Sequence, residues 1–312
     1  MLRYRKFVLA IVLGCYLPLT AAAQPATPQP PAGVTHHADI TYLETKSGPL
    51  QLDIALPAQG ADRLPAVMII HGTGGFSKGR KANLPLMFEL AQKGYVGVAI
   101  SFRYTAADPY PAAIDDVRAA VSWLRANAAK YRIDPHRIAA FGYSGGGSLA
   151  LMLGMPDSPG AKKDPNSRVQ AVVAYYPPTD LAQLHADCGG KKIGGFAGVF
   201  IKSNLEKWLE GTPQTMPKRY AEASPVTHVR KEMAPAFLVH GTADNVVPID
   251  QSRLLVDRAA VKGGRVMLLE LPGAGHNFDE LKDANAAMAA QMVQTFLDRH
   301  LRAQAPGVAQ RK

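Results

Sequence analysis

Cysteine and long apolar runs are both scarce in this sequence of 312 residues. Its two cysteines, Cys15 and Cys188, are too few for a scaffold held together by disulfides. After residue 23 no segment approaches the roughly 20 apolar residues that a transmembrane helix needs, so we expect no membrane span. The spacings H-x-x-H and C-x-x-C, typical of zinc sites, are absent. We therefore expect neither a metal nor a cofactor.

The sequence also lacks the patterns of a nucleic-acid-binding protein. Its net charge is +10, but the basic residues form only short clusters such as Lys191-Lys192 and Lys218-Arg219. No helix-turn-helix pattern and no basic stripe with interleaved aromatics is present, so no nucleic-acid partner is expected. With 47% hydrophobic and 19% charged residues, the composition excludes disorder and favours a large globular core.

The first 23 residues have the composition of a secretory signal peptide. Arg3, Arg5 and Lys6 precede an apolar run over residues 7–19, and residues 21–23 are three alanines. This order of segments predicts cleavage after Ala23 and a periplasmic or secreted protein. A lipoprotein signal centred on Cys15 is the alternative interpretation.

For the rest of the chain the sequence predicts a linker, one α/β domain and a tail. Residues 24–37 are rich in proline and predict an extended linker, residues 38–302 the domain, and residues 303–312 a flexible tail. Strand-like and helix-like segments alternate through the domain, which is typical of a mostly parallel sheet with helices on both faces.

About eight strands and three helices are predicted from apolar runs and periodicity. The strands are expected at 38–45 and 50–56, as a hairpin at one edge, and at 66–70, 96–100, 137–141, 169–175, 236–239 and 266–269, buried on both sides. Apolar stripes predict helices over 111–130, 249–262 and 281–301. Residues 177–235 break the alternation and predict an irregular insertion that acts as a lid.

A G-x-S-x-G pentapeptide, Gly142-Tyr143-Ser144-Gly145-Gly146, follows the predicted strand 137–141 directly. A nucleophile on a tight strand-to-helix turn needs glycine at both ends of this motif, because Cβ atoms there would collide. The motif predicts that Ser144 is a nucleophile, exposed at the start of a helix whose free N–H groups favour negative charge.

A serine nucleophile requires a histidine base and a carboxylate that orients the histidine. His276 follows the last predicted strand and Asp244 follows the strand before it, and such loops gather reacting groups in an α/β sheet. Asp180 follows a different strand and Asp279 opens a helix, so Asp244 is the preferred acid. His240 is expected to support the loop that carries this acid.

The glycine-rich loop His71-Gly72-Thr73-Gly74-Gly75 follows the strand predicted at 66–70. Backbone N–H groups of such a loop can stabilise an oxyanion, and the amide after the nucleophile supplies a second donor. We predict an oxyanion hole made by Gly145 and either Thr73 or Gly74. His71 is expected to brace the loop. No Gly-Lys-Ser/Thr follows, which argues against a phosphate site.

Taken together, residues 38–302 resemble the serine α/β hydrolases, closest to the small esterases of the hormone-sensitive-lipase and feruloyl- and acetyl-esterase-like groups. The catalytic domain of prolyl-oligopeptidase-type peptidases is also similar. Further motifs that carry the resemblance are Phe102-Arg103-Tyr104, residues 110–117, residues 133–138 and residues 223–226. The resemblance implies an α/β-hydrolase fold and a Ser-His-Asp triad. Two features differ from the esterase pattern: Thr73 replaces a glycine, and residues 240–248 are closer to the peptidase and carbohydrate-esterase type.

The favoured hypothesis is a secreted carboxylic-ester hydrolase for short-chain or aromatic acyl esters, on a small molecule or a polysaccharide. An exopeptidase or amidase and a catalytically silent binding protein are the alternatives, and the oligomeric state is not predicted. The predicted substrate pocket contains Tyr143, Phe196, Phe200 and Phe278. Trp208 and Tyr220 belong either to this pocket or to a small core of the lid. Cys188 is expected to be a structural or free thiol.

Overall fold

The computed structural model describes residues 28–302 except 75–78, 105, 157, 160–163, 191 and 282–283, and the side chains of residues 280 and 281 are also not described. The predicted signal peptide, Cys15, the first residues of the linker and the tail 303–312 lie outside this part of the chain. Gly75, the last residue of the glycine-rich loop, is outside it as well.

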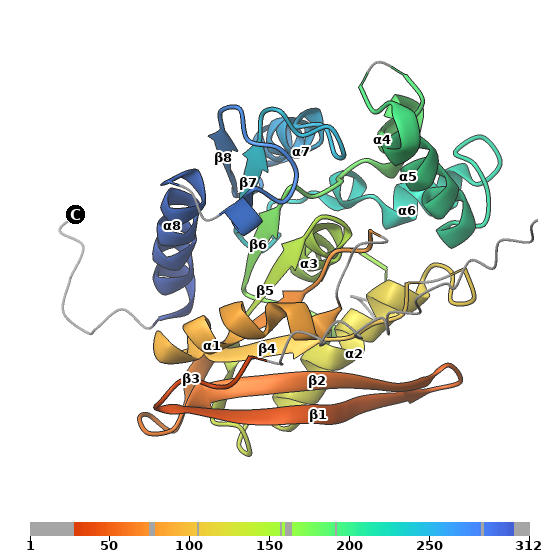
Figure 1. The fold of residues 1–312 in the computed structure, drawn as a ribbon. Coiled ribbons are helices and arrows are strands. Elements are labelled where there is room, and N and C mark those ends of the chain that lie inside the picture. The colour runs from red at the N-terminus through yellow and green to blue at the C-terminus, as the bar shows by residue number, and fades with distance from the viewer. Residues whose placement is uncertain are drawn as a thin grey trace, which may run out of the picture.

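Eight strands form one sheet in the order β1-β2-β4-β3-β5-β6-β7-β8 (Figure 1). The strands are β1 Val34–Thr45, β2 Gly48–Pro57, β3 Leu64–Ile70, β4 Val96–Ile100, β5 Ile133–Tyr143, β6 Ala171–Tyr175, β7 Ala236–Gly241 and β8 Val266–Leu271. The pairs β1–β2 and β2–β4 are antiparallel, and every other pair is parallel. This confirms the predicted fold class and the edge hairpin.

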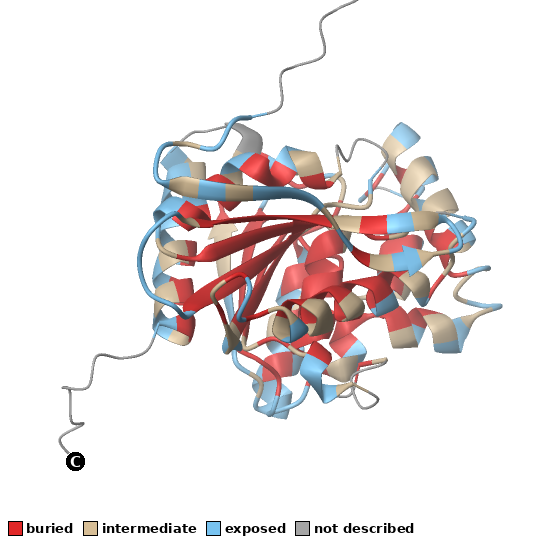
Figure 2. Cartoon of the chain, turned by 90° about the horizontal axis from the view of Figure 1, so that it is seen from below, coloured by how far each residue is buried: buried red, intermediate tan, exposed pale blue. Residues whose placement is uncertain are grey.

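Helices cover both faces of the sheet. The helices that pack on the sheet are α1 Leu84–Gln92, α2 Ala112–Ala126, α3 Gly145–Gly154, α7 Asp250–Lys262 and α8 Ala284–Leu301. Four short 3-10 helices are η1 Arg80–Asn83, η2 Pro165–Ser167, η3 Pro225–His228 and η4 Phe278–Leu281. Along β3, Met68 and Ile70 join the apolar cluster that α2, α3 and α7 cover, whereas Val67 and Ile69 join the cluster under α1 and α8. Figure 2 shows that burial is concentrated in these central strands.

Two predictions are wrong at the edges of the sheet: where the first strand begins, and how far the last strand is buried. β1 begins at Val34, so residues 34–37 belong to the strand and not to the linker. β8 is not buried on both sides: it is the last strand of the sheet, and Met267 is 52% exposed. A strand that pairs on one side only keeps part of its surface in solvent, whatever its apolar content.

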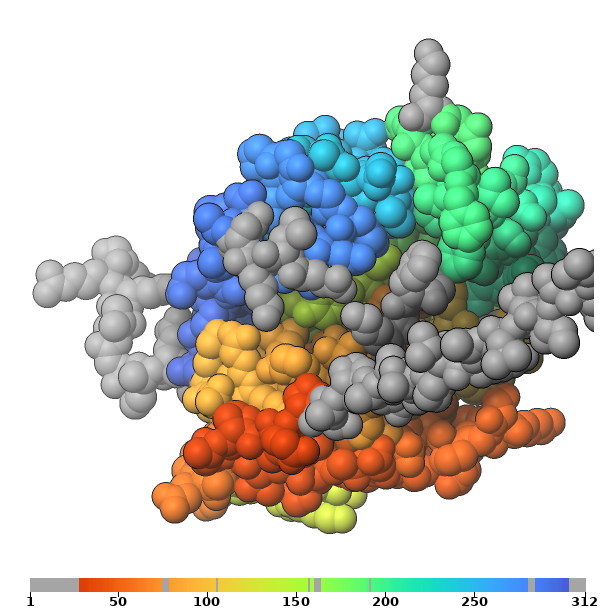
Figure 3. Space-filling model, viewed as in Figure 1, coloured from red at the N-terminus to blue at the C-terminus, as the bar shows by residue number. Residues whose placement is uncertain are grey.

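The insertion between β6 and β7 is helical instead of irregular. It contains α4 Leu181–Asp187, α5 Gly195–Trp208 and α6 Pro217–Ala223. In the space-filling view these helices, in green to teal, form one continuous block beside the segment around α7 (Figure 3). The insertion buries its own apolar residues, including Leu184, Leu205 and Tyr220.

Cys188 ends α4 as a buried, free thiol. Its Sγ donates a hydrogen bond to the carbonyl of Leu184 at 3.2 Å, and burial raises the pKa of the thiol. These properties agree with a structural role. None of the helices in the described ranges is long and apolar enough to cross a bilayer.

Candidate active site

Ser144 lies on the turn between β5 and α3 in a strained backbone conformation. Its φ and ψ angles are 51° and −124°, which are unusual for a residue with a side chain. The Ser144 N–H donates to the carbonyl of Tyr175 at 2.9 Å, and the N–H of Gly147 donates back to the Ser144 carbonyl at 2.8 Å. The neighbouring strand and the first turn of the helix therefore hold the turn in place.

The glycines around this turn leave room for backbone atoms that come very close. A Cβ atom on Gly142 would overlap the carbonyl of Gly146, and a Cβ atom on Gly146 would overlap the carbonyls of Ile70 and His71. The need for glycine at both ends of the motif is thus confirmed. Because Gly146 has no side chain, the turn can pack directly on the backbone at the end of β3.

His276 and Asp244 are joined by a hydrogen bond. The Nδ1–H of His276 donates to Oδ2 of Asp244 at 2.7 Å, and Oδ1 accepts the backbone N–H groups of Val246 and Val247 at 2.9 Å each. The Asp244 side chain is fully buried. Both carboxylate oxygens are therefore occupied, and the ring of His276 is oriented by one of them.

His240 supports the loop of Asp244, as predicted. The His240 ring is buried, and its Nε2 lies 2.8 Å from the carbonyl of Val247 and 3.2 Å from Oδ2 of Asp244. Its Nδ1 lies 2.7 Å from the hydroxyl of Ser252 on α7. Burial alone would raise the pKa of Asp244, but hydrogen bonds with His240 and His276 hold it well below its usual range. Asp244 is therefore a stable carboxylate.

The two alternative acids have other partners. Asp180 caps α4 by accepting the N–H of Gln183 at 3.0 Å. Asp279, in η4, accepts the hydroxyl of Tyr176 at 2.7 Å. The ring of Tyr176 also packs on His276, with 4.3 Å between ring centroids. The geometry thus pairs the Nδ1 of His276 with the preferred acid.

His71 braces the glycine-rich loop. Its Nδ1–H donates to the carbonyl of Gly72 at 2.8 Å, and its ring stacks on Phe102 with centroids 4.4 Å apart. Burial lowers the pKa of His71, which favours the neutral ring. The interpretation of His71 as a bracing residue is in agreement with these contacts.

The same loop lies directly against the turn that carries Ser144. A Cβ atom on Gly72 would lie 3.6 Å from the Cβ of Ser144. A Cβ atom on Gly145 would lie only 2.8 Å from Cγ2 and 2.9 Å from Cβ of Thr73. The Thr73 side chain and the backbone of Gly145 therefore pack together.

A cavity of about 920 Å³ contains most of the predicted site residues in its wall, whereas Asp244 and Phe278 are not among its lining residues. Ser144, His276, Thr73, Gly74 and Gly145 all line it. Three of the four predicted pocket residues, Tyr143, Phe196 and Phe200, line it too, together with the apolar side chains Ile114, Leu149, Met152, Leu181, Leu184 and Leu205. The cavity thus combines one polar cluster with a mainly apolar wall.

Phe278 is not part of the cavity wall, contrary to prediction. It is 1% exposed and packs on Tyr175 and Tyr176, with ring centroids 5.1 and 5.5 Å apart. Its ring turns into the core because η4 folds back over β6. Tyr220 is likewise buried outside the wall and donates its hydroxyl to the Gly211 carbonyl at 3.1 Å.

Sequence reasoning left three aromatic residues out of the pocket or undecided. Tyr104, Tyr110 and Trp208 line the cavity, with the Trp208 ring 4.9 Å from that of Tyr104 and 5.6 Å from that of Tyr110. Trp208 lies on α5, whereas the tyrosines follow β4. The motifs that contain Tyr104 and Tyr110 were the sequence signals for this part of the wall, although neither indicated a pocket.

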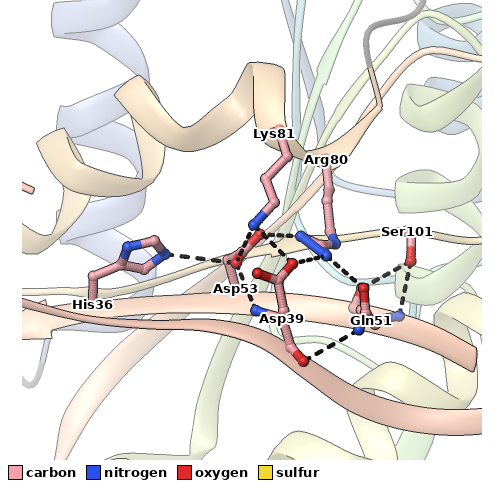
Figure 4. Close-up of polar contacts among 7 residues, drawn as sticks. All are labelled: His36, Asp39, Gln51, Asp53, Arg80, Lys81 and Ser101. Atoms are coloured by element: carbon pink, nitrogen blue, oxygen red, sulfur yellow. Dashed lines mark hydrogen bonds and ion pairs between the residues drawn. The ribbon is translucent and has the colours of Figure 1, made fainter. Parts of the chain in front are cut away.

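A buried carboxylate anchors the chain that follows the glycine-rich loop (Figure 4). Asp53 on β2 is completely buried and binds the guanidinium of Arg80 at 2.5 Å and the Nζ of Lys81 at 3.0 Å. Asp39, on β1, has an exposed side chain and binds both cations as well. Because Gly79 lines the cavity, this cluster ties the cavity rim to the sheet.

Within the described ranges, no group of three or more His, Cys, Asp or Glu side chains is arranged to hold a metal ion.

Three comparisons place the chain among known proteins. Residues 52–258 match the family model described as BD-FAE. The probable carboxylic ester hydrolase LipM of Mycobacterium tuberculosis is 34% identical over 75% of this chain, and the alignment covers 54% of LipM. The chain thus spans only about half the length of that relative.

Two solved esterases have the same fold. Esterase 2 of Thermogutta terrifontis, in a propionate-bound structure, aligns with a TM-score of 0.68 and 25% identity over 88% of this chain and 97% of its own. A truncated carbohydrate esterase from gut microbiota aligns with a TM-score of 0.65 and 27% identity over 82% of this chain and 96% of its own. The match to the family model runs from within β2 to within α7 and includes the turn of Ser144, and the chain accordingly belongs to the BD-FAE family of α/β hydrolases.

Proposed function

We propose that this protein is a serine carboxylic-ester hydrolase. The observation that carries the proposal is that Ser144 and His276 line one cavity while Asp244 is bonded to His276. This combination supplies a nucleophile, a base and an orienting carboxylate. The names of LipM and of the two solved esterases support the same reaction.

In the proposed mechanism His276 takes the hydroxyl proton of Ser144 through Nε2 while Oγ attacks the ester carbonyl. The N–H of Gly145, with that of Thr73 or Gly74, stabilises the oxyanion. Collapse of the tetrahedral intermediate releases the alcohol, which takes the proton from His276, and leaves an acyl-enzyme. Water then attacks this acyl group, again with His276 as base, and frees the acid and Ser144.

The substrates we propose are esters of short-chain or aromatic acids, on a small molecule or a polysaccharide. The aromatic side chains Tyr104, Phe200 and Trp208 and the aliphatic wall suit an apolar acyl group. The propionate-bound structure of Thermogutta terrifontis esterase 2 supports a short acyl chain. The helical insertion, residues 177–235, is proposed as the lid, and a periplasmic or secreted location is proposed from the first 23 residues.

The test is hydrolysis of p-nitrophenyl acetate, butyrate and octanoate and of an aminoacyl p-nitroanilide by the chain and by its Ser144→Ala variant. Ester turnover should fall about 10⁶-fold in the variant. Near-normal turnover by Ser144→Ala would refute the assignment. Faster turnover of the anilide than of the esters would favour an amidase, and no Ser144-dependent turnover of any substrate would favour a binding protein.

A further inference from the structure

Tyr176, the residue directly after β6, lies against the imidazole of His276. The centroids of the two rings are 4.3 Å apart, and their planes are inclined by 53°. This separation is shorter than the roughly 4.5 to 7 Å that is typical of aromatic pairs, so the rings are in direct contact. Both residues line the cavity that contains Ser144. The mechanism proposed above uses the imidazole but gives its aromatic neighbour no role.

The ring of Tyr176 is held in this place by two hydrogen bonds. Its hydroxyl donates to Oδ1 of Asp279 on η4 at 2.7 Å, and its backbone N–H donates to the carbonyl of Val239 on β7 at 2.8 Å. The residue is 2% exposed, and its φ angle is 39°, in a region that residues with a side chain rarely adopt. The fold therefore maintains an unfavourable backbone conformation at the residue whose ring contacts His276.

The charge on His276 changes during the proposed reaction. When its Nε2 takes the hydroxyl proton of the nucleophile, the neutral imidazole becomes an imidazolium. Asp244 accepts its Nδ1–H at 2.7 Å, and His240 lies 3.2 Å from the same carboxylate oxygen. Asp279 is a second carboxylate, bonded to the hydroxyl of Tyr176. The tyrosine ring is thus the uncharged group that contacts the imidazole among these titratable side chains.

We propose that the ring of Tyr176 stabilises the imidazolium form of His276 and that Tyr176 is therefore a positioning residue for the base. A cation within about 6 Å of an aromatic centroid is attracted by the negative charge on the faces of the ring. Asp244 acts on one nitrogen of the imidazole, whereas Tyr176 contacts the ring itself. This inference rests on the proposed ester hydrolysis and adds a second source of stabilisation for the charged base.

The direction of a pKa change distinguishes this role from simple packing. Tyr176→Leu removes the aromatic ring, so the charged form of His276 loses stabilisation and its pKa should fall by about 0.5 to 1. The plateau of kcat/KM should fall about three- to tenfold for the same reason. Loss of packing alone acts the other way, because water that enters beside the imidazole favours its charged form and raises its pKa.

The experiment measures kcat/KM for p-nitrophenyl acetate from about pH 4.5 to 9, a range that brackets the ordinary pKa of histidine. Active sites are titrated with an organophosphate, so that unfolded protein does not count. Tyr176→Leu should move the acid limb of the profile to lower pH, and Tyr176→Met is a second variant without a ring in case the first does not fold. Tyr176→Phe keeps the ring, so its acid limb should stay within about 0.3 of the original pH.

Asp279 is the alternative source of the effect, because its carboxylate is bonded to Tyr176. If the ring itself acts, Tyr176→Leu should shift the acid limb equally in the unsubstituted chain and in an Asp279→Asn background. A shift that disappears in this background would assign the effect to Asp279 and overturn the inference.

Phe237→Leu is the matched control, because it removes another buried ring from the same apolar cluster. The Phe237 ring packs on Phe296, and its loss should leave the acid limb unchanged per titrated site. An acid limb that stays in place or moves to higher pH in Tyr176→Leu, or an equal shift in Phe237→Leu, would overturn the inference while leaving the ester hydrolase intact. Absence of Ser144-dependent turnover in the unsubstituted chain would instead overturn the proposed function, and the inference with it.

Discussion

Asp244 contacts a second imidazole ring, that of His240, in addition to the ring of His276. Oδ2 of Asp244 lies 3.2 Å from Nε2 of His240 and 2.7 Å from Nδ1 of His276. The Val247 carbonyl can only accept, so the Nε2 of His240 carries a proton, while its Nδ1 is hydrogen-bonded to the hydroxyl of Ser252. One carboxylate oxygen thus contacts the ring of His240 on β7 and the ring of His276 in the loop after β8.

Asp244→Asn should lower kcat about 10⁴-fold with little change in KM. The amide keeps the volume of the side chain but removes the negative charge that holds His276 in the productive tautomer. Steady-state kinetics on p-nitrophenyl butyrate checks this, with near-UV circular dichroism to confirm that the variant is folded. A loss below tenfold would show that another group orients His276.

The same carboxylate should make stability depend on pH in acid. The pKa of Asp244 is lower in the folded chain than in the unfolded chain. Its contribution to stability is therefore fully present above the unfolded pKa, near 4, and is lost as the pH falls toward the folded pKa. Urea unfolding at pH 5 and pH 2.5 should show a larger stability gap between the unsubstituted chain and Asp244→Asn at pH 5. An equal gap at both pH values would contradict the assignment.

Gly142→Ala should be severely destabilising. The new Cβ atom would overlap the Gly146 carbonyl and come within 2.6 Å of the Gly147 nitrogen, and these backbone atoms are fixed by the turn. We expect a loss of about 3 kcal/mol or more in the free energy of unfolding. Gly190→Ala is the control, because its Cβ would come no closer than 3.7 Å to any heavy atom outside the adjacent residues. Similar urea midpoints for the two variants would refute this explanation.

The two carboxylates that bind Arg80 should differ in their importance. Asp53 has a side chain with no exposed surface, whereas that of Asp39 is 55% exposed. Asp53→Asn leaves the buried guanidinium without its main counterion and should cost about 3 kcal/mol. Asp39→Asn should cost about 1 kcal/mol or less, because water replaces an exposed partner. Thermal unfolding of both variants tests the order, and equal losses would contradict it.

The turn of Ser144 could be predicted from sequence because its requirements are local. The glycines at 142 and 146, the preceding apolar strand and the following apolar helix all lie within about 15 residues. The loops of Asp244 and His276 were located from the order of apolar segments, since each follows a strand in the parallel part of the sheet. The sequence alone did not predict how close these two loops lie to the turn of Ser144, because that distance depends on the order of the strands in the sheet.

Other features depend on contacts between distant segments. The exposure of β8 follows from its place at the end of the sheet, and its apolar sequence resembles that of a central strand. The three helices of the insertion lack a regular apolar stripe because they bury residues against one another and around the cavity. Phe278 was predicted as a pocket residue, but its ring on η4 is buried in the core.

Because Trp208 lies in the cavity wall, it can serve as an intrinsic fluorescence probe of the cavity. The chain has only two tryptophans, and the other, Trp123 on α2, packs on Tyr131 away from the cavity. In a Trp123→Phe background all indole emission would come from the wall that touches Tyr104 and Tyr110. A shift in the emission maximum of Trp208 would then report the binding of an acyl group, or a movement of α5, without an added label.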